Sequence, residues 1–115
     1  MHEVTVCDSL LDLVEETARK HNARRVAVVR VRIGEISGVV PELLEHAFEI
    51  LAPERNLTRN ASLVMDRVKP AAHCETCGKD FEPEEYIFIC PACGSGRTRL
   101  TAGDELSLDR VEMEV

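Results

Sequence analysis

Residues 74–94 read CETCGKDFEPEEYIFICPACG, and the rest of the chain is organised around this segment. It contains two Cys-x-x-Cys-Gly motifs with twelve residues between the second and third cysteines. Each motif supplies two thiolates, and the residues between them can fold back as a hairpin to bring all four together. Four thiolates favour zinc and leave no open coordination position. The sequence therefore predicts a structural zinc site formed by Cys74, Cys77, Cys90 and Cys93.

Other functions of these four cysteines are less well supported by the sequence. Two redox-active dithiols are disfavoured, because one pair suffices for that chemistry and neither pair lies at a strand-to-helix junction. An iron–sulfur cluster is the remaining metal alternative. His73 directly precedes Cys74 and is a candidate modulator of the metal site; the alternative is an exposed histidine beside the motif.

The composition of residues 70–103 differs from that of the flanking chain. This segment holds all four motif cysteines, four of the six glycines and three of the five prolines, and it shows no helical period. It has few large apolar side chains, whereas a structural zinc ion contributes roughly 10–16 kcal/mol in peptides. We expect residues 70–103 to be an inserted zinc-binding domain that loses its fold without metal.

Four periodic segments precede this insert. Apolar residues at three- and four-residue spacing over 4–18 predict an amphipathic helix. Its outer face pairs Glu15 with Arg19 and Glu16 with Lys20, and the His21-Asn22 segment suits its end. The β-branched run 26–33 alternates with arginines and predicts a strand with one buried face. Helical spacing returns over 41–51, beginning at a proline, and alternation over 62–69 predicts a second strand.

Apolar and polar residues alternate over 106–115, as in a strand, but the alternation shifts by one residue partway along. The apolar side chains of 106–108 and 111–115 share one face only if a bulge lies near Asp109 and Arg110. An isolated terminal strand would be unstable, so we expect it to join the sheet formed by 26–33 and 62–69.

These elements together predict an α+β fold. Two helices pack on a small, mainly antiparallel three-stranded sheet, with the cysteines in an inserted zinc-ribbon-like module. The α/β domain comprises residues 1–69 plus 104–115. Its core must be mostly aliphatic, because the chain of 115 residues has only three Phe, one Tyr and no Trp. Cys7 belongs to the apolar stripe of the first helix and is expected to be buried; an auxiliary thiolate ligand is the alternative.

The net charge, and the lack of a membrane-spanning run or a signal peptide, argue against several classes of function. With 14 Lys+Arg against 21 Asp+Glu, the net charge of −7 repels phosphate backbones and anionic membranes. No apolar run is long enough to cross a membrane, and the first residues lack the features of a signal peptide. We therefore expect a cytoplasmic protein that binds neither nucleic acid nor membranes.

The first three residues, Met1, His2 and Glu3, bring an α-amine, an imidazole and a carboxylate together. With ordinary pKa values of about 7.7–8.0 and 6.5, the amine and the imidazole can both present neutral nitrogen near physiological pH. A metal held by these groups promotes loss of amide protons, so the backbone nitrogens of His2 and Glu3 can complete a planar nitrogen set. Such a set favours Ni(II) or Cu(II). The alternative is an ordinary frayed terminus.

This pattern resembles the HypA/HybF family of nickel-binding hydrogenase-maturation proteins. The resemblance covers almost the whole chain. It rests on Met1-His2-Glu3 before an amphipathic helix, on Arg32-Ile33-Gly34-Glu35-Ile36-Ser37 after a strand, and on the two cysteine motifs. The resemblance implies Ni(II) as transient cargo at Met1, His2 and Glu3, and structural Zn(II) at the four cysteines.

The resemblance also implies partners. Members of the family deliver nickel into the precursor of the large subunit of NiFe hydrogenase together with the GTPase HypB, and some serve urease maturation. We expect a monomer or homodimer that delivers metal and is not an enzyme. Two other functions remain open: a zinc-ribbon adaptor for nucleic acid or protein assembly without nickel handling, and a dithiol oxidoreductase. His46 is expected to be an ordinary surface or partner-facing residue, and its spacing from Glu42, one turn earlier, allows the two side chains to pair.

Overall fold

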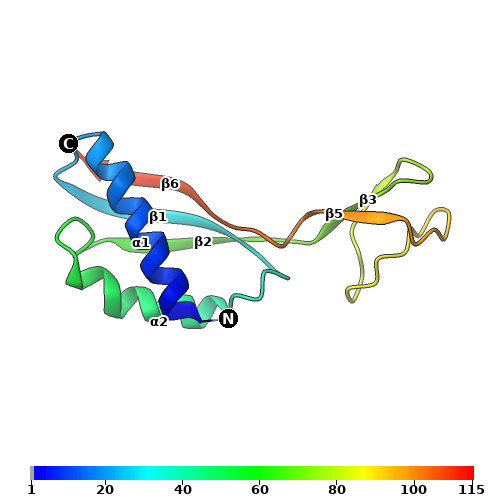
Figure 1. Cartoon of the computed structure of the whole chain (residues 1–115), viewed down its shortest axis with the longest axis horizontal. Helices are drawn as coiled ribbons and strands as arrows, with labels where there is room; N and C mark the ends of the chain where they lie inside the picture. Colours follow the sequence, from blue (N-terminus) through cyan, green and yellow to red (C-terminus); the bar gives the residue numbers. More distant parts are fainter. Residues whose placement is uncertain (1) are drawn as a thin grey trace.

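The computed structural model describes residues 2–115, which form an elongated molecule of 54 × 26 × 16 Å (Figure 1). Two three-stranded sheets lie toward opposite ends of the long axis. Both helices lie beside one sheet, and the cysteine motifs lie beside the other.

The first helix, α1 (Glu3–Lys20), buries the apolar stripe expected from its spacing. It ends where the sequence predicts, and the two expected pairs on its outer face form, since Glu15 and Glu16 contact Arg19 and Lys20 at 3.1 and 3.5 Å. Basic residues in the last turn also complement the partial negative charge at a helix C-terminus. The second helix, α2 (Pro41–Leu51), has the bounds predicted from sequence and is followed by a short 3-10 helix, η1 (Ala52–Glu54).

The main sheet consists of β1 (Arg25–Gly34), β2 (Ser62–Val68) and β6 (Leu106–Glu114), in the order β2-β1-β6. β6 pairs with β1 antiparallel, whereas β2 pairs with β1 parallel. The parallel pairing follows from the chain path, because α2 carries the chain back across the sheet between β1 and β2. Over both sheets the antiparallel pairings outnumber this one, and the predicted class is confirmed.

The predicted bulge in the last strand is present. Arg30 of β1 pairs with Arg110 and the next residue, Val31, pairs with Leu108, so Asp109 is the extra residue. A second register shift falls between Val26 and Val28. The bulge at Asp109 keeps the apolar residues of β6 half-buried on one face while their neighbours are exposed.

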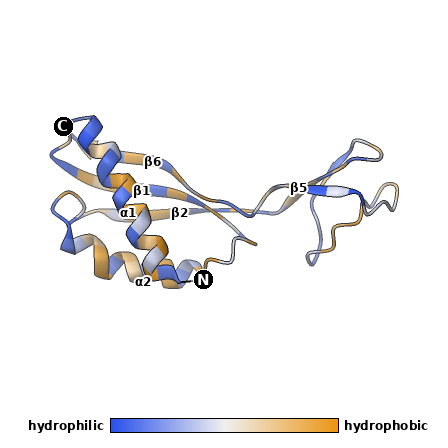
Figure 2. Ribbon diagram, viewed as in Figure 1, coloured by the Kyte–Doolittle hydropathy of each residue, from blue (hydrophilic) through white to orange (hydrophobic). Residues whose placement is uncertain are grey.

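The second sheet contains β3 (Ala71–Cys74), β4 (Asp80–Phe81) and β5 (Thr98–Ala102), in the order β4-β3-β5. Both pairings are antiparallel. Figure 2 shows hydrophobic residues gathered in the helices and the main sheet, whereas β5 is hydrophilic or neutral. In the loop before the second cysteine motif, Tyr86, Ile87, Phe88 and Ile89 are all exposed.

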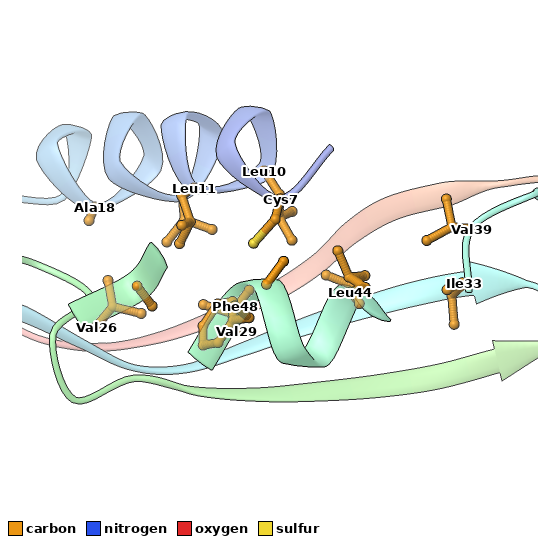
Figure 3. Packing of buried hydrophobic residues seen from close by; sticks show 14 residues of the cluster. Cys7, Leu10, Leu11, Ala18, Val26, Val29, Ile33, Val39, Leu44 and Phe48 are labelled. Atoms are coloured by element: carbon orange, nitrogen blue, oxygen red, sulfur yellow. The ribbon is translucent and has the colours of Figure 1, made fainter. Parts of the chain in front are cut away.

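The hydrophobic core lies between the helices and the main sheet and is almost wholly aliphatic (Figure 3). Cys7, Leu11 and Val14 of α1 are fully buried, as are Val29 and Leu44 beneath them. The expected burial of Cys7 is confirmed. Burial raises the pKa of its thiol to about 11, so the thiol is protonated at neutral pH.

The two sheets are joined at a tight crossing of backbone. Gly34 N–H donates to Glu105 O at 2.7 Å, and Ile36 N–H donates to Gly103 O at 2.9 Å. A Cβ on Gly34 would lie 2.0 Å from that Gly103 oxygen, and Gly103 itself has φ +107° with Pro70 directly beside it. Only glycine fits at these two positions.

Candidate metal centres

The four motif cysteines converge in the insert. Cys74 ends β3, Cys77 lies in the turn that follows, and Cys90 and Cys93 come from the second motif. Their Sγ atoms all lie within 4.8 Å of one another. The Sγ–Sγ distance is 3.6 Å between Cys74 and Cys93, and again 3.6 Å between Cys77 and Cys90. This is the convergence that the motif spacing predicted.

These distances fit a tetrahedral metal ion. With Zn–S bonds of about 2.3 Å, tetrahedral geometry places the sulfurs about 3.8 Å apart. A disulfide would require about 2.05 Å, and all five cysteines of the chain are free. The donor set and the spacing therefore suit a metal ion such as zinc, with all four positions filled by protein.

The backbone of each motif is shaped to support the thiolates. Gly78 and Gly94 have φ values of +78° and +76°, in the left-handed region that favours glycine. Their N–H groups donate to the carbonyls of Cys74 and Cys90 at 2.9 and 2.8 Å, which closes each turn. The Cys77 N–H points at Cys74 Sγ from 3.5 Å. Such N–H groups orient the sulfurs and stabilise their charge.

The thiol pKa values diverge in this cluster. The Cys77 N–H, with that of Thr76, lowers the pKa of Cys74 to about 6. Although Ser95 N–H favours the Cys93 thiolate, desolvation and the neighbouring sulfurs raise the pKa of Cys93 to about 12. Four close sulfurs cannot all ionise without a cation between them. The cluster therefore requires a positive ion to hold four thiolates.

His73 lies next to this cluster but its ring is engaged elsewhere. Nδ1 lies 2.6 Å from Asp80 Oδ1, and the two residues face each other across the β3–β4 pairing. Among residues 2–115 the clustered ligand groups are the four cysteines alone. This contact could not be predicted from local sequence, because it depends on the register of β3 with β4.

The nickel residues predicted from sequence lie at the start of α1, except that Met1 is outside the described residues. His2 is the N-cap and Glu3 the first helical residue. The carbonyl of His2 accepts the first helical hydrogen bond, from Val6 N–H at 3.0 Å. The N–H groups of His2 and Glu3 lie at the N-cap and the first helical position, so neither donates to a backbone carbonyl of the helix.

The Glu3 carboxylate connects the two helices. It accepts a hydrogen bond of 3.3 Å from the backbone N–H of Val40, which is the N-cap of α2. This bond, together with the N–H of Glu3 itself, lowers the pKa of the Glu3 carboxyl. The side chain of Glu3 thus holds the beginnings of both helices together.

A cavity of about 300 Å³ adjoins this point. Its wall includes His2, Glu3 and Val4 from the start of α1, and Leu43, His46, Ala47 and Ile50 from one face of α2. The Glu42 carboxylate, which the helical spacing would allow to pair with His46, instead contacts Arg67 at 3.2 Å. The only sequence feature that indicated this face of α2 is the helical spacing of apolar residues over 41–51.

Comparisons with known proteins agree with this architecture. A family model described as "Hydrogenase/urease nickel incorporation, metallochaperone, hypA" matches residues 1–113. The hydrogenase maturation factor HypA of Aquifex aeolicus is 43% identical over 115 residues, which cover all of this chain and 99% of that protein. The corresponding factor of Geobacter metallireducens is 38% identical over 99% of the chain and all of that protein.

Solved structures give the same result. The solution structure of the Ni metallochaperone HypA from Helicobacter pylori superposes with a TM-score of 0.77 at 34% identity, covering 99% of this chain and 98% of that one. A second solution structure of a HypA protein gives 0.78 at 35% identity, with 98% and 96% covered. Fold, cysteine cluster and relatives define a metallochaperone of the hydrogenase-maturation class.

More specifically, the chain belongs to the HypA family. The family consists of nickel-handling maturation factors, and the four-cysteine site is consistent with zinc. A nucleic-acid adaptor without nickel handling is not favoured. Among the described residues, no helix is long and apolar enough to span a membrane.

Proposed function

We propose that this chain binds Ni(II) as cargo through the α-amine of Met1, the imidazole of His2 and the backbone nitrogens of His2 and Glu3. The observation that supports this set most directly is the start of α1 at Glu3. Because the helix begins there, two consecutive amide nitrogens have no helical acceptor and can bind metal without breaking the hydrogen bonds of the helix.

The charges at this position suit the proposed complex. A bare cation at a helix N-terminus is disfavoured by the partial positive charge there. Two deprotonated amide nitrogens carry charges of −1 each, which together offset the charge of Ni(II). The planar nitrogen set also matches the geometry preferred by Ni(II). In this proposal the Glu3 carboxylate acts by joining α1 to Val40, as the hydrogen bond between them suggests.

The four cysteines are proposed to hold a resident Zn(II) whose role is structural. Zinc would supply the folding energy of the insert, and with four protein ligands it offers no position for a substrate. His73 is proposed to modulate this site from its place beside Cys74, with Asp80 holding its ring. A faster transfer of zinc to a chelator from the His73→Ala variant would support that role.

Two parts of the chain are proposed to carry the two metals separately. Residues 1–69 with 104–115 form the nickel-binding domain, and residues 70–103 form the inserted zinc-binding domain. The hydrophobic core supports this division, since its members and the residues packed on them lie outside 70–103.

The cargo's destination is proposed from the family. Nickel passes to the precursor of the large subunit of NiFe hydrogenase with the help of the GTPase HypB, and urease maturation factors are further candidate recipients. We propose that the chain works in the cytoplasm as a monomer or homodimer, without contacting membranes or nucleic acid, and that it transfers metal without catalysing a reaction.

Calorimetric titration of the zinc-loaded protein with Ni(II) tests the terminal site. The untagged chain should bind one Ni(II), and His2→Ala should abolish this binding while zinc content and helicity stay unchanged. One residue added before Met1 should also abolish it, because the added peptide bond removes the amine. His21→Ala is the matched control, since His21 lies at the other end of α1 with its ring on Thr17 O. Nickel binding that survives His2→Ala unchanged would refute the assignment.

A further inference from the structure

The four histidines of the chain fall into two pairs. His21 Nδ1 contacts Thr17 O at 2.9 Å, and His73 Nδ1 contacts Asp80 at 2.6 Å. The rings of His2 and His46 form neither a hydrogen bond nor an ion pair with any residue in the described range 2–115. These two histidines line the same cavity, one at the start of α1 and the other on α2.

The walls of this cavity offer few other donors. Of its seven lining residues, Val4, Leu43, Ala47 and Ile50 are apolar, and Glu3 is engaged with the Val40 N–H. Two imidazoles are therefore the donor side chains left available there. Imidazole nitrogen is a good ligand for nickel.

The direction of the His46 side chain brings its ring toward the nickel-binding residues. Side chains of an α-helix tilt toward its N-terminus. The N-terminus of α2 is where Val40 holds Glu3, next to His2. From this general tilt we expect His46, in the second turn of α2, to lean toward the first residues of α1 that line the same cavity.

We propose that His46 is a further nickel ligand, whose imidazole binds the same Ni(II) as His2 from across the cavity between α1 and α2. This inference rests on the proposed terminal site. The planar nitrogen set leaves the two axial positions of nickel free, and His46 occupies one of them. With His46 at one axial position and water at the other, the centre is six-coordinate and paramagnetic, whereas a planar Ni(II) centre is diamagnetic, so the contact has a spectroscopic signature.

The cavity also gives His46 a role in release. An axial ligand on a second helix is independent of the N-terminal chelate, so it can leave first and open a position for a donor from the recipient. Val4, Leu43 and Ile50, which are 61, 52 and 55% exposed, surround this opening with an apolar rim. Nickel held by both histidines is thus reachable from outside the molecule.

X-ray absorption and magnetic susceptibility of the nickel-loaded, zinc-loaded wild-type protein test the proposal without a variant. We expect two imidazoles per Ni(II) and a paramagnetic centre. One imidazole and a diamagnetic planar centre would overturn the proposal, whatever the variants do.

The variants His46→Ala and His46→Gln provide the second arm. Both residues suit an exposed position in a helix, and far-UV circular dichroism checks that α2 is retained. We expect nickel affinity to fall at least about tenfold in each, because loss of even an outer-shell partner costs metal sites 10–100-fold. The imidazole count should fall to one, and the centre should become diamagnetic. His21→Ala should match wild type.

The outcomes separate the two claims. If the His46 variants retain wild-type affinity and spectra while His2→Ala loses nickel, His46 is not a ligand and the terminal site stands. If His2→Ala retains nickel unchanged, the terminal site itself is wrong, and the shared ion proposed here is excluded with it.

Discussion

The five cysteines occupy two environments that change the thiol pKa in different ways. Cys7 sits in an aliphatic core where no cation or N–H group favours its thiolate enough to offset burial. The pKa of Cys74 is lowered to about 6 by backbone N–H groups that its motif turns toward the sulfur. Burial therefore makes Cys7 inert, whereas backbone geometry prepares Cys74 to bind metal.

The raised pKa of Cys7 makes the stability of the main domain depend on alkaline pH. The thiol has an ordinary pKa of 9.0 and a folded value of about 11. Its contribution to stability is complete below pH 9 and is lost as the pH rises through 11. We expect the free energy of unfolding to fall by roughly 2 to 3 kcal/mol over this range.

Urea unfolding of the zinc-loaded protein at several pH values measures this effect, and the Cys7→Ala variant is its control. The variant should lack the part of the alkaline decrease that comes from the thiol. An identical pH profile in both proteins would show that Cys7 does not titrate in the folded state as described.

At the scale of single residues, the sequence identified the four clustered cysteines from their spacing alone. It could not show that Asp80 engages His73 or that His46 shares a cavity with His2. Both contacts join residues on different elements, and they depend on strand register or on how two helices pack. Local patterns carry no information on either.

At the scale of elements, periodicity was a reliable guide because each helix and strand buries one face. The helices end within two residues of their predicted limits, and the bulge at Asp109 was implied by the phase of the apolar residues. The direction of β2 was harder to predict. A parallel neighbour results from the crossover through α2, and the alternation within β2 is the same in either direction.

The crossing between the sheets gives a prediction for backbone packing. In Gly34→Ala the new methyl group would meet Gly103 O at 2.0 Å. We expect the free energy of unfolding to fall by at least about 2 kcal/mol, as in other overpacked sites. Gly96→Ala is the matched control, because no atom lies within 4 Å of the position its Cβ would take. Equal denaturant midpoints for the two variants would contradict the crossing as described.

Removal of the metal should destabilise the sheet of the insert and leave the main sheet stable. The insert places Tyr86, Ile87, Phe88 and Ile89 on its surface, so it has little apolar burial to replace zinc. On chelation we expect the amides of β3 and β5 to lose protection from hydrogen exchange, while those of β1 and β6 keep it. Exchange measured by mass spectrometry before and after zinc removal tests this. Protection lost equally from both sheets would mean that zinc supports the whole fold.

At the scale of the whole molecule, the elongated shape separates the cysteine cluster from the proposed nickel site at the start of α1. The cysteines lie in the insert, and α1 begins at the end of the helical layer nearer to that insert (Figure 1). The similarity to the Helicobacter pylori structure extends over 99% of the chain, so it includes the insert as well as the helices. Partners that contact the start of α1 therefore approach a surface close to the crossing of the two sheets.

The meeting of Pro70 with Gly103 has a consequence for how this architecture can change. The insert leaves and rejoins the main domain at one point, where a Cβ on Gly103 would lie 2.5 Å from Pro70 Cα. A short turn could bridge that gap without altering the order β2-β1-β6. The insert is thus exchangeable: recombination or design could replace it with another module, and the helical half would keep its strand order and the terminus that we propose to bind nickel.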